Sequence, residues 1–143
     1  MLGDWEDEFL GLLQWDTTFG EWQGQVDFPR HGEVGVGLPL EYRDSREMQT
    51  HIQATFRIIE RDEPAFRERA ARELFDNGGY VLFWPEGKLY KPDEFAREMH
   101  LGLITFEPEF PDMSLRLGYE YGEGVEHGIT IFLTWDGTYK SAR

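Results

Sequence analysis

Two runs near the C-terminus alternate between large apolar side chains and other residues. Residues 115–121 and 129–135 form an apolar stripe made of Leu115, Leu117, Tyr119, Tyr121, Ile129, Ile131, Leu133 and Trp135. A period of two places alternate side chains on one face of a β-strand. Two glycines in residues 122–127, between the runs, favour a chain reversal. The pattern predicts an antiparallel hairpin with Ile131 and Leu133 in the core.

The first forty residues contain three further segments of similar length that are typical of strands. Residues 9–15, 21–28 and 33–40 are each typical of a strand, and turn-forming residues separate them. Gly35 and Gly37 occupy one face of the third segment, which suits the close approach of another backbone or a strongly twisted strand. This opening stretch predicts a three-stranded meander.

The middle of the chain changes to a helical period. Apolar side chains recur every three or four residues at Met48, Ile52, Phe56 and Ile59. The spacing predicts a helix over 45–61. A second helix is predicted to begin near Pro64, which the first turn tolerates, and to end at Asn77. A short third helix should follow Pro92, whereas the apolar run 80–84 fits a strand or a buried loop equally well.

The order of these elements indicates an α+β fold. Strands at both ends enclose the helices, a further strand is expected over 101–106, and no repeat or linker divides the 143 residues. We therefore expect one α+β domain over 1–143. Its core should be a single antiparallel sheet of five or six strands from both ends of the chain, with two to three helices packed on one face.

The charge and the composition exclude several functions. The chain has 28 acidic and 14 basic residues, a net charge of −14, and no cysteine. This charge repels phosphates and anionic lipids, so we expect neither a nucleic acid nor a membrane as partner. Thiolate catalysis, cysteine-based zinc sites and disulfides are excluded. The acidic start is unlike a signal peptide and no run is long enough to span a membrane, so a cytoplasmic protein is predicted.

The negative charge is concentrated at the N-terminal end. Residues 1–40 contain eight acidic residues and one basic residue, a net charge of −7. Such a concentration either serves solubility alone or steers a basic partner protein. On the second interpretation the protein is a non-catalytic intracellular binding module of undetermined oligomeric state. Its candidate contact residues are Glu6, Asp7, Glu8 and Glu21.

Two alternative functions use other residues. Aromatic rings such as Trp15 and Trp22, on an uncovered face of the sheet, could stack on a sugar or another small ligand. A metal-assisted or acid–base hydrolase would use His127 and Glu126, although His127 also suits a structural role in the hairpin loop. The four histidines, His31, His51, His100 and His127, show no metal-binding spacing. No cofactor and no metal site are predicted.

Several segments resemble a family of bacterial proteins. They are GEWQGQV at 20–26, VGVGL at 34–38, AAREL at 70–74 and HGITIFL at 127–133, which precedes Asp136 and Gly137. The chain is similar over most of its length to a family of short acidic proteins known only as a domain of unknown function, without assigned catalytic residues. The resemblance implies a bacterial cytoplasmic domain with an immunity-like or accessory role that works by binding.

Overall fold

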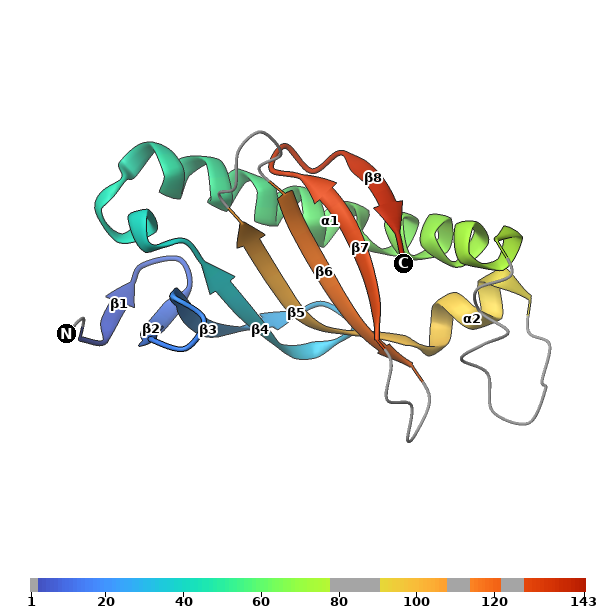
Figure 1. Cartoon of the computed structure of the whole chain (residues 1–143), viewed down its shortest axis with the longest axis horizontal. Helices are drawn as coiled ribbons and strands as arrows, with labels where there is room; N and C mark the ends of the chain where they lie inside the picture. Colours follow the sequence, from blue (N-terminus) through green and yellow to red (C-terminus); the bar gives the residue numbers. More distant parts are fainter. Residues whose placement is uncertain (1–2, 78–90, 108–113, 122–127) are drawn as a thin grey trace.

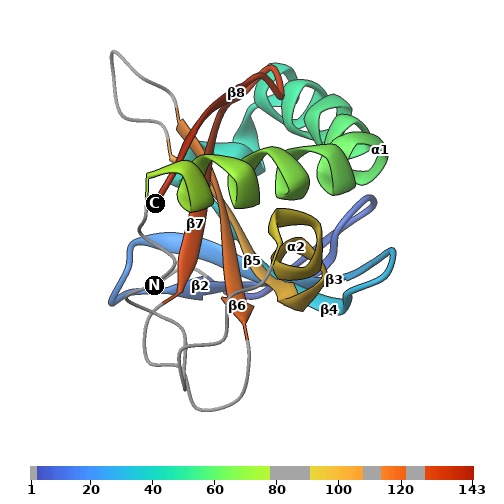
Figure 2. The same ribbon diagram turned by 90° about the vertical axis from the view of Figure 1, so that its right-hand side faces the viewer.

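The computed structural model describes residues 3–77, 91–107, 114–121 and 128–143. Among these residues, the α-helices lie on one side of a curved sheet (Figures 1 and 2). The strands are β1 (Trp5–Asp7), β2 (Gly11–Asp16), β3 (Glu21–Phe28), β4 (Gly32–Leu38), β5 (Met99–Glu107), β6 (Ser114–Tyr121), β7 (Ile129–Thr134) and β8 (Tyr139–Ala142). The helices are the short 3-10 helix η1 (Leu40–Asp44), α1 (Arg46–Asp76) and α2 (Pro92–Glu98). We call the helix-covered side of the sheet its inner face and the opposite side its outer face.

The sheet is mixed, and this corrects the predicted fold. Its eight strands follow the order of the chain, and every neighbouring pair is antiparallel except β4 and β5, which are parallel. An antiparallel sheet of five or six strands with two to three helices is therefore wrong for the described residues. Helices α1 and α2 connect β4 to β5, and a helical crossover returns the chain to the same end of the sheet. The unforeseen strands β1 and β8 have only three and four residues, too few to show a period of two.

The 31-residue helix α1 passes through Pro64 without ending, so the predicted break there is wrong. Ser45 begins the helix, because its hydroxyl accepts a hydrogen bond from the Met48 N–H at 3.1 Å. Buried residues continue on both sides of Pro64, at Ile52, Thr55, Phe56, Ile59, Glu63, Ala70, Ala71 and Leu74. The packing of this face offsets the loss of the backbone hydrogen bond that proline cannot donate. No helix among the described residues is both long and apolar enough to cross a membrane.

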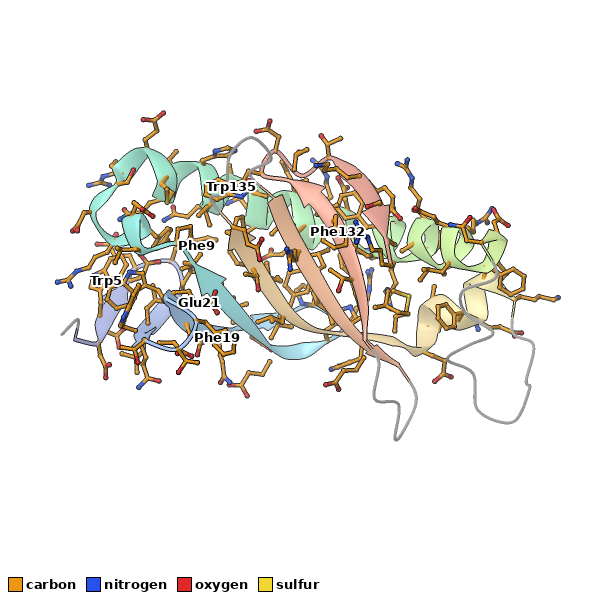
Figure 3. All side chains as sticks on the ribbon, in the orientation of Figure 1. Trp5, Phe9, Phe19, Glu21, Phe132 and Trp135 are labelled. Atoms are coloured by element: carbon orange, nitrogen blue, oxygen red, sulfur yellow. The ribbon has the colours of Figure 1, made fainter. Side chains whose placement is uncertain are left out.

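The inner face of the sheet and the buried face of α1 enclose a hydrophobic core. The predicted hairpin is confirmed, since β6 pairs with β7 and places Leu115 opposite Leu133 and Leu117 opposite Ile131. Ile131 and Leu133 have no exposed surface, as predicted. Trp135 lies beside α1, where its ring meets that of His51 at a centroid distance of 5.8 Å (Figure 3). The hairpin therefore supplies one wall of the core.

The substitution Leu133→Ala is expected to lower the free energy of unfolding by about 2–5 kcal/mol, because it leaves a cavity in a fully buried site. Urea denaturation monitored by tryptophan fluorescence measures the change. Thr130→Ala is the control, since Thr130 is half-buried on the same strand. Equal midpoints for the wild-type protein and Leu133→Ala would contradict the packing described here.

Candidate functional site

The acidic residues of the N-terminal segment have different structural roles. Asp7 is buried, and its carboxylate accepts hydrogen bonds from the backbone N–H groups of Phe9 and Leu10 at 3.2 and 2.8 Å. It also accepts one from the Tyr42 hydroxyl at 3.1 Å. Asp16 stabilises the next turn through its own carboxylate. Asp7 is therefore an anchor of the β1–β2 turn with little surface for a partner.

Glu6 and Glu8 are exposed and line an open depression of about 480 Å³ beside the start of α1. Glu21 lies elsewhere, on the outer face of the sheet (Figure 3). Its carboxylate accepts a hydrogen bond from the Gln23 side chain at 3.1 Å. It also covers Gly37, where an added Cβ would come within 2.6 Å of a carboxylate oxygen. The four predicted acidic contact residues are thus not gathered at one point.

The two tryptophans proposed to stack on a ligand pack against each other instead. Trp22 has no exposed surface, and its indole N–H donates to the Leu40 carbonyl oxygen at 3.3 Å. The half-buried rings of Trp15 and Trp5 meet Trp22 edge-on at centroid distances of 5.3 and 6.2 Å. Trp22 faces the core because it alternates with the outer residues Glu21 and Gln23 along β3. Its ring offers no surface to a sugar in this arrangement.

An open groove crosses the outer face over strands β2 to β5, and we call it the outer groove. Its volume is about 620 Å³, and the residues that line it include Leu12, Glu33, Gly35 and Leu103. Gly35 pairs with Leu103, whose methyl group would lie 3.3 Å from an added Cβ. Leu12 and Leu103 are 48% and 47% exposed. Three glutamines, Gln14, Gln23 and Gln25, add hydrogen-bonding groups. The groove therefore combines apolar surface with polar side chains.

The negative charge of the N-terminal segment is not neutralised by ion pairs with the part of the chain that the structure describes. None of the eight acidic residues of 1–40 forms an ion pair with another described residue. Acidic residues of the helices, by contrast, do so, as in the pairs of Asp62 with Arg61 and of Asp93 with Arg97. Unpaired charges of one sign add up to a field that attracts a cationic partner.

A second candidate site is buried between α1 and the sheet, and we call its four residues, His31, Glu63, Arg67 and Tyr119, the His31 cluster. His31 follows β3 in the turn to β4, and Glu63 and Arg67 lie one helical turn apart on α1. The exposed fractions of His31 and Glu63 are only 6% and 1%. Buried polar groups of this kind are costly unless they are paired.

Hydrogen bonds determine which nitrogen of His31 carries the proton. Its Nδ1 accepts the backbone N–H of Leu101 at 3.0 Å, and its Nε2 contacts Glu63. A backbone N–H can only donate, so Nδ1 is unprotonated and Nε2 donates to the Glu63 carboxylate. Arg67 completes the arrangement, with its Nε 3.2 Å from Glu63 and an N–H that donates to the Ala96 carbonyl oxygen.

The surroundings favour a neutral His31. Burial lowers its pKa below the usual 6.5, and the positive charge of Arg67 and the neighbouring His100 act in the same direction, whereas Glu63 opposes them. Burial also raises the pKa of Tyr119, which stays a neutral phenol. Both ring nitrogens of His31 already have partners, so neither is available to a substrate. The cluster therefore suits a structural or regulatory role better than acid–base catalysis.

The remaining histidines do not form a metal site in the described part of the chain. His51 contacts the exposed Asp136 at 3.0 Å, and the exposed His100 places its ring centroid 5.3 Å from that of His31. No group of three histidine or carboxylate side chains among the described residues is placed to hold a metal ion. His127 and Glu126 lie outside the described residues, so the hydrolase alternative stays an untested prediction.

Comparison with known proteins does not assign the chain to a family. No protein-family model, no curated protein and no solved structure matches the chain. The resemblance to the bacterial family of unknown function therefore stays a prediction.

The sequence contained a signal for the His31 cluster that the predicted break at Pro64 concealed. If the helix continues through Pro64, Glu63 falls four residues after Ile59 and shares its apolar face. An acidic residue in that position requires a buried counter-charge, and Arg67 follows after one further turn. The partner from the β3–β4 turn, His31, carries no comparable signal because it is distant in sequence.

The substitution Glu63→Ala is expected to lower the free energy of unfolding by about 3–5 kcal/mol, because Arg67 loses its buried counter-charge and His31 its acceptor. Urea denaturation at pH 7.5 measures the loss. The matched control, Glu68→Ala, removes an exposed carboxylate from the same helix and should change stability by less than about 0.5 kcal/mol. Similar effects of the two substitutions would show that the buried pair contributes nothing.

Proposed function

We propose that the protein is a non-catalytic binding module that docks a basic protein on the outer face of its sheet. The observation that carries the proposal is the outer groove, which combines two half-exposed leucines with Glu33, an acidic residue that lacks an ion-pair partner in the described structure. At such a surface, apolar contacts contribute most of the affinity. Complementary charges increase the association rate and select the partner.

The charges indicate what kind of surface the partner presents. Glu33 lines the groove, and Glu21 lies on the same outer face of β3. A complementary surface would carry an apolar side chain that fits between Leu12 and Leu103, surrounded by lysine or arginine. The exposed Glu6 and Glu8 lie outside the groove, and they extend the negative field beyond it.

A small ligand is a weaker candidate for this surface. Pockets for small molecules enclose most of the ligand, whereas the outer groove is open to solvent along the sheet. The tryptophan rings that would stack on a sugar are packed around Trp22. The groove instead suits a broad contact, in which a few central side chains contribute most of the binding energy.

Reversal of three exposed acidic residues, Glu6→Lys, Glu8→Lys and Glu33→Lys, is expected to slow association with the partner at least tenfold while dissociation changes little, because steering acts before contact. The partner is first recovered from the source cell by affinity capture. Stopped-flow mixing then measures both rates at low salt and at about 0.15 M, where screening shortens the reach of charge to about 8 Å.

The control for this experiment reverses three exposed acidic residues of the helices, Glu68→Lys, Asp76→Lys and Glu98→Lys. It changes the net charge by the same amount but leaves the N-terminal segment unaltered. Equal slowing by both triple variants, or an association rate that ignores salt, would overturn the electrostatic part of the proposal.

Leu103→Ala is expected to raise the dissociation rate about tenfold or more, because it removes half-exposed apolar surface from the lining of the docking site. Folding should be little affected, since the side chain is half-exposed. Leu40→Ala is a closely matched control, with the same residue type and 48% exposure but a position in η1 outside the groove. Equal dissociation rates for the two variants would exclude the outer groove as the docking site.

A further inference from the structure

His31 connects three segments that are distant in the sequence. From the turn between β3 and β4, its ring contacts Glu63 on α1 and accepts the N–H of Leu101 at the start of β5. The partners are 32 and 70 residues away along the chain. A single imidazole therefore holds the turn, the long helix and the fifth strand together.

The hydrogen bond to Leu101 lies where backbone pairing between β4 and β5 is missing. The parallel pairs run from Gly35 with Leu103 to Gly37 with Thr105, and none precedes Leu103. The register of β5 against β6 is also irregular between Leu101 and Leu103. The His31 side chain thus continues the connection between β5 and the β4 side beyond the last backbone pair.

A second proton on His31 is incompatible with this arrangement. Nε2 already carries the proton that Glu63 accepts, so a further proton must bind to Nδ1. Nδ1–H and the Leu101 N–H would then be two donors facing each other across 3.0 Å. The hydrogen bond to Leu101 cannot survive the protonation, because no acceptor remains between the two nitrogens.

The groups around His31 lower its affinity for a second proton but do not prevent that proton from binding. Glu63 and Arg67 face it from α1, His100 from β5 and Tyr119 from β6, while the neighbouring ring of β3 is the uncharged Phe28. Burial, Arg67 and His100 disfavour the imidazolium, and only Glu63 favours it. The neutral form therefore persists in the folded protein to a lower pH than in the unfolded chain.

We infer that His31 is a proton-sensitive contact, whose protonation in mildly acidic solution releases the start of β5 from the β3–β4 turn. The released segment, from Met99 to Leu101, leads directly into Leu103 and the parallel pairs with β4. The device is local, because the backbone pairs from Gly35 onward do not depend on His31.

The same release would act on the outer groove. Gly35 and Leu103 both line the groove, four residues after His31 and two residues after Leu101, respectively. Loss of the His31 contact frees the backbone immediately before Leu103, so the Leu103 side chain is held less firmly in the groove. This consequence rests on the proposed function, and it predicts weaker docking in acidic solution, where His31 is protonated, than at pH 7.5.

Protonation of His31 also changes the stability of the fold, and the sign of the change depends on whether the folded or the unfolded state binds more protons. Between pH 6.5, the usual value for histidine, and the lower pKa of His31 in the fold, the unfolded chain binds a proton on His31 that the folded protein does not yet bind. The folding equilibrium constant therefore falls as the pH decreases, by up to about tenfold per pH unit for one proton. Above pH 6.5 neither state binds this proton, so His31 adds no pH dependence there.

The test uses the isolated full-length protein labelled with ¹⁵N and follows two signals between pH 7.5 and 5. Nitrogen chemical shifts of His31 are expected to show protonated Nε2 and bare Nδ1 at pH 7.5, and protonation of Nδ1 at the acidic end. The protection of the Leu101 amide against hydrogen exchange should fall over the same pH range. Protection of the central Leu117 amide on β6 should stay constant.

Two variants separate His31 from other titrating groups. In the His31→Gln variant, the glutamine amide can accept from Leu101 and donate to Glu63, but it cannot be protonated. The protection of the Leu101 amide against hydrogen exchange should then no longer depend on pH. His51→Gln, at the surface contact with Asp136, should keep the wild-type dependence. If His31→Gln does not fold, the nitrogen shifts of His31 and the protection of the Leu101 amide in the wild-type protein still test the inference.

Protonation of His31 with unchanged protection of Leu101 would overturn the inference, and so would a loss of protection while His31 stays neutral. No partner is present in these measurements, so a failed docking proposal would leave their outcome unaffected. Docking measured separately at pH 7.5 and 5.5 tests the link to the groove. Equal affinities at both values would overturn that link alone.

Discussion

Burial of one continuous face of α1 against the sheet is the constraint on which the other features depend. The helix extends over 31 residues, and its buried positions continue across Pro64 from Ile52 to Leu74. Such a helix must cross the sheet, so the strand after it runs parallel to the strand before it. The curvature of the sheet around the helices follows from the same demand, because a flat sheet would leave part of this face in water (Figure 2).

Polar residues inside this core hold segments in place where backbone pairing is lacking. Asp7 organises the turn between β1 and β2, and Thr55 on α1 donates to the carbonyl oxygen of Trp135 after β7. Glu63 connects α1 to His31 and the β3–β4 turn. A buried polar group without a hydrogen-bond partner destabilises the folded protein. These contacts therefore favour one specific arrangement of the segments as well as stabilising it. His31 differs from the others because its acceptor nitrogen can take up a proton as the solution becomes acidic.

The two faces of the sheet have separate roles in the proposed function. The inner face contributes stability through its large apolar side chains, while the outer face carries glycines, glutamines and acidic residues with little to bury. This division explains why the first forty residues tolerate a net charge of −7. Their exposed carboxylates point into water, where self-repulsion is screened and a cationic partner can approach.

The sequence by itself determined the elements whose side chains repeat with a clear period. The hairpin of β6 and β7 and the buried positions of Ile131 and Leu133 follow from local alternation, as does the helical character of 46–76. Only the tertiary structure decided that α1 continues through Pro64 and that β4 and β5 are parallel. It also brought His31, Glu63 and Leu101 together. Periodicity records which face of an element is apolar, whereas contacts between residues distant in the chain depend on how those faces are packed together.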